Sequence, residues 1–282
     1  MLKIEPITPH IGARIHGLSL SDCSESELDD VYKALVTYQV IFLDEQSLSP
    51  EQHLALAKRF GDLEPAHPFF PRVEQVPQVS VIETTRGNAP MESYWHTDLT
   101  WRELPSKASL LHAQHVPDVG GDTIWCSMTA VFDSLDESMK DKLRGLSATH
   151  SLVAFEGIES DQIELDWHKS LLKTAQENPP VVHPLVQVHP ETGKETLYIN
   201  EQFTRYINEL EREESDSLLS QLFEIALRPE YQVRFKWNKG SMAIWDNRVT
   251  QHYAVIDYGD TPRKMHRVTV TLRCKSSPRR SD

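Results

Sequence analysis

The residues whose types and spacing point most directly to chemistry are His96 and Asp98, which lie within the stretch 94–101. That stretch is aromatic and β-branched, which favours an extended strand. Because alternate residues of a strand point to the same face, an imidazole and a carboxylate would lie side by side. A distant histidine would complete a 2-His-1-carboxylate triad, the ligand set of non-haem Fe(II) oxygenases. Taken alone, however, a His-x-Asp pair is more often a polar pair at the end of a strand.

His252 is the candidate for the third ligand. It is one of thirteen histidines, most of which need no metal, and it lies in the strand-rich last third of the chain. Arg263 and Arg267 follow it at short range. A guanidinium matches a carboxylate with two parallel hydrogen bonds and stays charged, so such an arginine can reach the far end of a metal-bound dicarboxylate. For Arg263 taken alone, a surface ion pair in an acidic protein is the favoured alternative.

The elements that would position these residues are mostly strands. Amphipathic spacing predicts a helix over 24–38, and Ser49-Pro50 followed by Gln52 is typical of a second helix start. The remaining apolar runs are short and separated by turn residues, which indicates antiparallel sheets packed as a sandwich or barrel. We therefore expect a mainly β fold with helical insertions. Its expected strands are 39–43, 79–82, 108–116, 124–126, 181–188, 194–200, 231–237, 242–245, 250–255 and 266–273.

Composition limits the possible partners. The chain has 282 residues with 42 acidic and 29 basic side chains, so its formal charge is −13. Such a balance argues against nucleic acid or an anionic membrane as a partner, and it requires a locally basic pocket for any anionic substrate. Three widely spaced cysteines predict free thiols rather than disulfides. With no apolar run of signal-peptide or transmembrane length, we expect a cytoplasmic protein.

Two irregular segments are candidates for covering the site. The Pro-rich stretch 65–71 carries a histidine and two phenylalanines, and it is either a pocket wall or a Pro-stiffened surface crossing. The polar stretch 155–180 is long for a connection inside a β-rich domain. Long inserts of this kind are often lids, so we expect an active-site lid there.

Four motifs together resemble those of the taurine dioxygenase family of Fe(II)- and 2-oxoglutarate-dependent oxygenases. The resemblance runs from about residue 4 to residue 273 with similar spacing between the motifs. It implies one domain over residues 1–282 with a double-stranded β-helix (jelly-roll) fold. The motifs are Trp-His-Thr-Asp at 95–98, Gly-Gly-Asp-Thr at 120–123, Trp-Asp-Asn-Arg-Val-Thr-Gln-His-Tyr at 245–253, and Arg-Lys-Met-His-Arg at 263–267.

The same resemblance implies the cofactor and the ligands. Fe(II) would be held by His96, Asp98 and His252, with 2-oxoglutarate and O2 as co-substrates. Thr123 and Arg263 would hold the distal carboxylate of 2-oxoglutarate. The implied reaction hydroxylates a small taurine-like organosulfonate at the carbon bearing sulfur. Sulfite, an aldehyde, succinate and CO2 would be the products.

The substrate side of the resemblance is incomplete. Arg267 and His67 match positions that bind the sulfonate, with His67 acting as an anchor if it is protonated. Phe70, however, stands where the taurine-specific enzymes carry a tyrosine. Glu92 stands where they carry an asparagine, and a carboxylate there would repel a sulfonate unless it turns away or pairs with a substrate amine. We therefore expect a small anionic substrate that need not be taurine.

Three alternatives remain at this stage. The same chemistry on an alkyl sulfate ester or on a carboxylate would use the same anchor. A metal-binding jelly roll that senses a small acid without catalysis is the remote alternative. A sensor needs no vacant position for O2, so the complete triad together with Thr123 and Arg263 argues against it. The family resemblance further implies a homo-oligomer, either a dimer or a tetramer.

Overall fold

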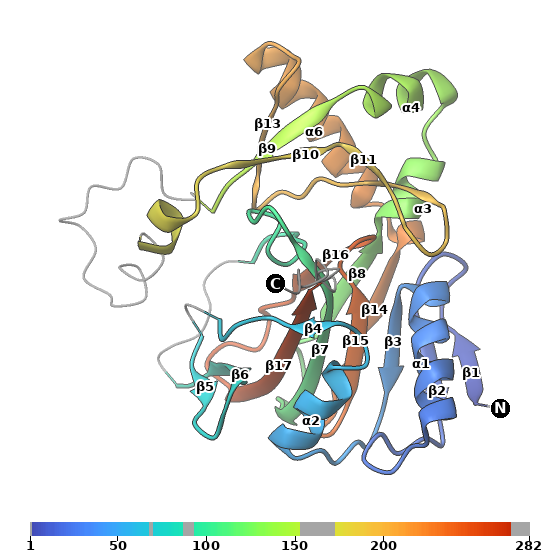
Figure 1. Cartoon of the computed structure of the whole chain (residues 1–282), viewed down its shortest axis with the longest axis vertical. Helices are drawn as coiled ribbons and strands as arrows, with labels where there is room; N and C mark the ends of the chain where they lie inside the picture. Colours follow the sequence, from blue (N-terminus) through green and yellow to red (C-terminus); the bar gives the residue numbers. More distant parts are fainter. Residues whose placement is uncertain (1, 68–69, 87–92, 153–172, 272–282) are drawn as a thin grey trace, which may run out of the picture.

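Two β-sheets face each other in the computed structural model, which describes residues 2–67, 70–86, 93–152 and 173–271 (Figure 1). Nearly all neighbouring strands are antiparallel, the β2–β3 pair being parallel. The large sheet has the order β1-β2-β3-β15-β7-β17-β6-β5, with β4 beside β17, and the small sheet has the order β14-β8-β16. The large sheet comprises β1 Lys3–Pro6, β2 Ala13–His16, β3 Val40–Leu43, β4 Asp62–Leu63, β5 Arg72–Val73, β6 Val76–Thr84, β7 Ser106–His115, β15 Met242–Asp246 and β17 Arg263–Thr271. The small sheet comprises β8 Thr123–Ser127, β14 Gln232–Phe235 and β16 Thr250–Ala254.

Both faces of the large sheet are buried. In β3, Ile41 and Leu43 belong to one apolar cluster, whereas Val40 and Phe42 belong to another. The second cluster also contains Trp125 of β8, so it fills the space between the two sheets. This two-residue alternation is the period of a pleated strand. A strand that is apolar on both faces is the expected outcome where helices cover the side away from the second sheet.

Helices α1 (Glu25–Tyr38) and α2 (Pro50–Ala57) cover that outer side (Figure 1). Both begin with a reciprocal capping box. Ser24 accepts a hydrogen bond from the Glu27 amide and Ser49 from the Gln52 amide, while the Glu27 and Gln52 side chains accept from the cap amides. The two helix predictions are therefore confirmed, including Pro50 at the first turn.

A second group of elements lies beyond one end of the sheets and builds its own apolar cluster (Figure 1). The expected long hairpin over 181–188 and 194–200 is partly wrong. The first run breaks at Leu185 because its two halves find different partners, β9 and β12. The elements of this group are α3 Met128–Asp133, α4 Glu137–Arg144, β9 Ser147–His150, β10 Val181–Pro184, β11 Val186–Val188, β12 Glu195–Leu197, β13 Thr204–Ile207, α6 Arg212–Ala226 and the 3-10 helix η2 Pro229–Tyr231.

Several expectations fall on residues that the structure does not describe. Residues 155–172 of the expected lid lie outside the described residues, as do Glu92 and Cys274. Residues 173–177 are helical. Cys23 and Cys126 are free thiols. Among the described helices, none has the length and apolarity needed to cross a membrane.

Candidate metal centre and co-substrate pocket

His96, Asp98 and His252 come together between the two sheets. One ligand atom from each side chain lies within 4.8 Å of the others, and within the described ranges this is the only such cluster of His, Cys, Asp and Glu. His96 Nε2 lies 3.9 Å from Asp98 Oδ1, and the ring centroids of the two histidines are 4.0 Å apart. Two imidazoles and one carboxylate form the donor set of a facial triad.

The backbone aligns the two histidines directly. His96 and His252 exchange both of their amide-to-carbonyl hydrogen bonds, at 3.0 and 2.8 Å, as an isolated antiparallel bridge. The predicted strand over 94–101 is wrong beyond this single pair, because the chain turns immediately afterwards and Leu99 has a φ of 60°. Asp98 therefore reaches His96 from a turn and not from the same face of a strand.

A hydrogen bond orients the ring of His96, and burial prepares both imidazoles for a metal. His96 Nδ1 lies 2.9 Å from the Tyr94 carbonyl. A carbonyl only accepts, so Nδ1 carries the proton and Nε2 presents its lone pair toward Asp98. Burial lowers the pKa of both His96 and His252. Both rings are thus neutral at physiological pH, which is the form that binds a metal.

Asp98 is oriented by a buried polar relay that the sequence analysis missed. Ser109 Oγ on β7 donates to Asp98 Oδ2 at 2.7 Å, and Asn247 Nδ2 donates to Ser109 Oγ at 3.0 Å. Trp245 Nε1 in turn donates to Asn247 Oδ1 at 2.9 Å, and the Trp245 ring packs 4.9 Å from that of His252. Asn247 lay inside a recognised motif, but no local pattern marked Ser109.

We expect Asn247→Ala to weaken Fe(II) binding by about 10- to 100-fold, the usual effect of losing a partner that orients a metal ligand. The reason is that Ser109 would lose the amide that fixes its hydroxyl. Anaerobic Fe(II) titration measures the change. Asn238→Ala, at an exposed turn position, is the matched control. Equal affinities for the two variants would contradict the role of the relay.

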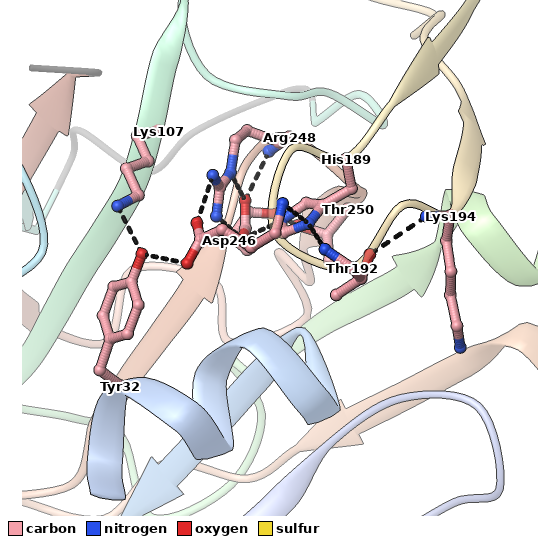
Figure 2. A network of polar contacts seen from close by, with 9 residues as sticks. Tyr32, Lys107, His189, Thr192, Lys194, Asp246, Arg248 and Thr250 are labelled. Atoms are coloured by element: carbon pink, nitrogen blue, oxygen red, sulfur yellow. Dashed lines mark hydrogen bonds and ion pairs between the residues drawn. The ribbon is translucent and has the colours of Figure 1, made fainter. Parts of the chain in front are cut away.

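A second polar network holds the turn between β15 and β16 (Figure 2). The Arg248 guanidinium donates to both Asp246 oxygens, and His189 Nε2 donates to Oδ2 at 3.1 Å. Burial raises the pKa of Asp246, but these hydrogen bonds outweigh it and lower the pKa overall. Arg248 also bonds Glu191, which accepts from Tyr32 at 2.7 Å. This turn carries Asn247 and leads into His252, so the network anchors both.

Arg263, on β17 of the large sheet, and Thr123, on β8 of the small sheet, are the two residues expected to hold the distal carboxylate of 2-oxoglutarate. Arg263 is only 7% exposed, and its Nε is buried without a hydrogen-bond partner. Among the described residues no carboxylate forms an ion pair with it, so the surface ion pair considered above is wrong. Burial lowers its pKa. Thr123 Oγ1 accepts from Trp237 Nε1 at 3.0 Å. A buried guanidinium without an anionic partner is costly unless a ligand supplies the anion.

Gly121 allows the turn before Thr123 to pack against that arginine. Its φ is +71°, which favours glycine, and a Cβ there would lie 3.4 Å from Arg263 Cδ and 3.2 Å from Pro117 Cγ and Tyr258 Cδ1. The Gly121 amide donates to Asp257 at 2.8 Å. The Gly-Gly turn therefore fixes the position of the Arg263 side-chain stem.

Arg267 lies four residues after Arg263 on β17, so the two side chains point to the same face of the strand. Its Nη1 is 3.1 Å from Asp98 Oδ1, and its guanidinium lies 5.0 Å from the centre of the Phe70 ring. The sequence predicted an arginine dedicated to the substrate, but the structure pairs it with the metal-site carboxylate. Burial would raise the pKa of Asp98, yet Arg267 and the two histidines lower it.

His67 stands beside Phe70, with their ring centroids 4.5 Å apart. Burial, reinforced by the positive charge of Arg267, lowers its pKa to about 3. The condition stated for a charged anchor, a protonated His67, is therefore not met in the ligand-free protein, where the imidazole is neutral. A cavity of about 20 Å³ adjoins it, large enough for roughly one water molecule. Its lining residues are Glu64, Pro65, His67, Gln78, Ser80, Asp98, Leu99, Arg102, Arg267 and Thr269.

Comparison with characterised proteins places this site in a family. The chain is 35% identical over 276 residues to an alpha-ketoglutarate-dependent sulfate ester dioxygenase of Pseudomonas putida, covering 95% of this chain and 89% of that protein. It is 31% identical over 290 residues to an alpha-ketoglutarate-dependent sulfonate dioxygenase of Saccharomyces cerevisiae, covering 96% and 66%.

Solved structures agree with these relatives. The crystal structure of a taurine dioxygenase from Burkholderia xenovorans superposes with a TM-score of 0.81 at 34% identity, covering 96% of this chain and 89% of that one. The family model described as taurine catabolism dioxygenase TauD, TfdA family matches residues 3–269. The chain therefore belongs to the TauD, TfdA family of dioxygenases.

Proposed function

We propose that this 2-oxoglutarate-dependent dioxygenase hydroxylates a small organosulfonate at the carbon that bears sulfur. Fe(II) is its cofactor, and 2-oxoglutarate and O2 are its co-substrates. One oxygen atom enters succinate as 2-oxoglutarate loses CO2, and the other replaces a C–H hydrogen of the substrate as a hydroxyl. The α-hydroxysulfonate then breaks its C–S bond to release sulfite and an aldehyde. The enzyme is an oxidoreductase.

The observation that carries this proposal is the buried Arg263 on β17, the strand that also carries Arg267, whose Nη1 bonds Asp98 of the triad. A facial triad alone fits many metal proteins. A buried guanidinium on the same face of that strand, with no carboxylate partner among the described residues, fits one end of a dicarboxylate whose other end binds the metal. The residues present therefore suit both Fe(II) and 2-oxoglutarate.

Each group has a role in this proposal. His96, Asp98 and His252 hold the metal, which when bound couples the decarboxylation of 2-oxoglutarate to substrate oxidation. Thr123 donates its hydroxyl proton and Arg263 its N–H groups to the distal carboxylate. We further infer that the facing sheets form a jelly roll and that residues 1–282 form one domain. The cytoplasmic location and the homo-oligomer remain predictions.

Arg267 and His67 bind the substrate head group in this proposal. A guanidinium has five N–H donors, so Arg267 can keep its bond to Asp98 and still donate to an anion. His67 adds a neutral N–H, and Phe70 contributes an apolar wall where no hydroxyl is available. A bound anion beside His67 would favour its protonation and thereby raise its pKa.

A sulfate ester is the second candidate substrate. The Pseudomonas putida relative, at 35% identity, carries sulfate ester in its name. Hydroxylation at the carbon next to the ester oxygen would release sulfate and an aldehyde. A carboxylate is a further candidate, because a relative at 31% identity is named for (S)-phenoxypropionate.

Anaerobic reconstitution with Fe(II) and 2-oxoglutarate, followed by O2, tests the function. Succinate, sulfite and sulfate are measured across a panel of sulfonates, sulfate esters and aryloxy-carboxylates. Sulfite equal to succinate for a sulfonate supports the leading proposal, whereas sulfate equal to succinate supports the second. Substrate-dependent succinate only with carboxylates would reject both sulfur substrates.

Arg267→Ala should raise the KM for the anionic substrate by roughly 10- to 100-fold, because charge-assisted hydrogen bonds contribute about 1.5–3 kcal/mol each. Because Arg267 also bonds Asp98, the assay is run at saturating Fe(II), where binding of 2-oxoglutarate should change little, since Arg263 is untouched. Initial rates measured while each co-substrate is varied separately give both constants. An equal rise in KM for the substrate and for 2-oxoglutarate would contradict this division of roles between Arg267 and Arg263.

A further inference from the structure

Glu64 and Arg102 form a second buried ion pair in the cavity next to the metal cluster. Arg102 Nη1 lies 2.7 Å from Glu64 Oε2, and the side chains are 25% and 9% exposed. Arg102 also lies 4.9 Å over the Trp101 ring, and it comes four residues after Asp98. Neither residue belongs to the proposed metal, co-substrate or head-group sites, although both line the same cavity as Arg267 and His67.

We propose that Arg102 and Glu64 select the substrate tail: it carries an uncharged oxygen acceptor and no second anionic group. This inference rests on the proposed function, because Arg267 and His67 are taken to hold the head group. It adds a requirement on the chemistry of the substrate tail, which binding of the head group does not determine.

The N–H groups of Arg102 favour a substrate tail that carries an oxygen acceptor. One of its five N–H groups is engaged by Glu64, and Trp101 holds the plane of the guanidinium. Of the pair, Arg102 is the more exposed. An ether, hydroxyl or carbonyl oxygen in the cavity would accept from Arg102. A methylene in the same place would displace solvent from the N–H groups of Arg102 and offer them no acceptor, which a site built for hydrogen bonding rejects.

The volume and the charges limit the tail further. The cavity has about 20 Å³ of free volume, so the group beside Arg102 is small. The two carboxylates of Glu64 and Asp98 balance the two guanidiniums of Arg102 and Arg267 in charge. Arg267 is assigned to the head group, so a second substrate anion would lie next to the Glu64 carboxylate with only the already paired Arg102 as a cation among the described lining residues.

Three sulfonates of similar size test the proposal. In 2-methoxyethanesulfonate an ether oxygen replaces one methylene of butane-1-sulfonate, and 3-sulfopropanoate places a carboxylate on the tail. We expect the wild-type enzyme to favour the ether over the butyl compound by about tenfold in kcat/KM. It should turn over 3-sulfopropanoate at least about tenfold less efficiently than the ether compound. Butyl and methoxyethyl sulfate form the corresponding pair for sulfate esters.

The variants separate the two residues. R102L should remove the preference for the ether, whereas E64Q should keep it and raise kcat/KM for 3-sulfopropanoate. R59L removes an exposed, ion-paired arginine and is the control. Dissociation constants of the three compounds, measured anaerobically by calorimetry with Fe(II) and 2-oxoglutarate bound, give a readout independent of turnover.

The outcomes distinguish this inference from the proposed function. Binding or turnover of these compounds without tail discrimination would overturn the inference and leave the proposed function standing. An E64Q variant that still rejects the carboxylate would also overturn it. If no sulfonate or sulfate ester binds or produces succinate, both proposals fail together. Circular dichroism and thermal melting of R102L and E64Q identify folding defects, and R102K then serves as the variant that keeps the charge.

Discussion

Replacing His252 with alanine is expected to lower Fe(II) affinity by more than about 100-fold, the upper end of the effect of losing an outer partner of a metal ligand. The imidazole itself is lost here, so only two of the three donors remain. The backbone bridge to His96 does not depend on the side chain and should persist. Anaerobic titration with Fe(II) measures affinity, and succinate formation measures the activity that should disappear with it.

His115→Ala is the matched control, because this histidine is exposed at the end of β7 and lies outside the cluster. Near-wild-type succinate formation is expected for it. An H252A protein that is folded by circular dichroism and still binds Fe(II) as tightly as the wild type would exclude the proposed triad.

The second large effect is expected for Arg263→Leu, and it has two parts with opposite signs. The KM for 2-oxoglutarate should rise roughly 10- to 100-fold, because the charge-assisted bonds to the distal carboxylate are lost. The ligand-free protein should nevertheless become more stable, because a buried guanidinium that forms no ion pair with any described carboxylate is replaced by an apolar side chain. Initial rates give the first quantity, and thermal melting without 2-oxoglutarate gives the second.

Adding 2-oxoglutarate should reverse the order of stability. The wild type gains stability in proportion to the logarithm of ligand concentration over Kd, whereas the variant gains little at the same concentration. Arg228→Leu, at an exposed arginine, controls for loss of a surface charge. A variant that melts below the wild type without ligand would show that Arg263 has structural partners and would weaken its assignment to the co-substrate.

Local sequence patterns predicted much of this fold because they report local physics. The capping boxes at Ser24 and Ser49 and the pleat period of β3 depend on residues a few positions apart. Arg267 lay inside the expected strand 266–273, but β17 begins three residues earlier, at Arg263, so the strand position of Arg263 was not predicted. The expectation of iron chemistry rested on four short motifs and needed no knowledge of how the sheets pack.

What the sequence did not predict depends on long-range contacts or on backbone geometry. Aromatic and β-branched residues around His96 favoured a strand, but the positive φ of Leu99 turns the chain there. The Ser109–Asn247 bond and the Glu64–Arg102 pair join residues far apart in sequence, which no local pattern reveals. The neutral state of His67 follows from burial and from Arg267, which only the folded structure shows.

The bridge between His96 and His252 also has a consequence for biosynthesis. These two residues belong to segments separated by more than half of the chain, and contacts of such long range form late because the intervening loop must first be closed. A nascent chain that has not yet extended to β16 contains two of the three proposed iron ligands. If these three residues hold the iron as proposed, tight iron capture would wait for β16, and unfinished chains would be spared a redox-active metal.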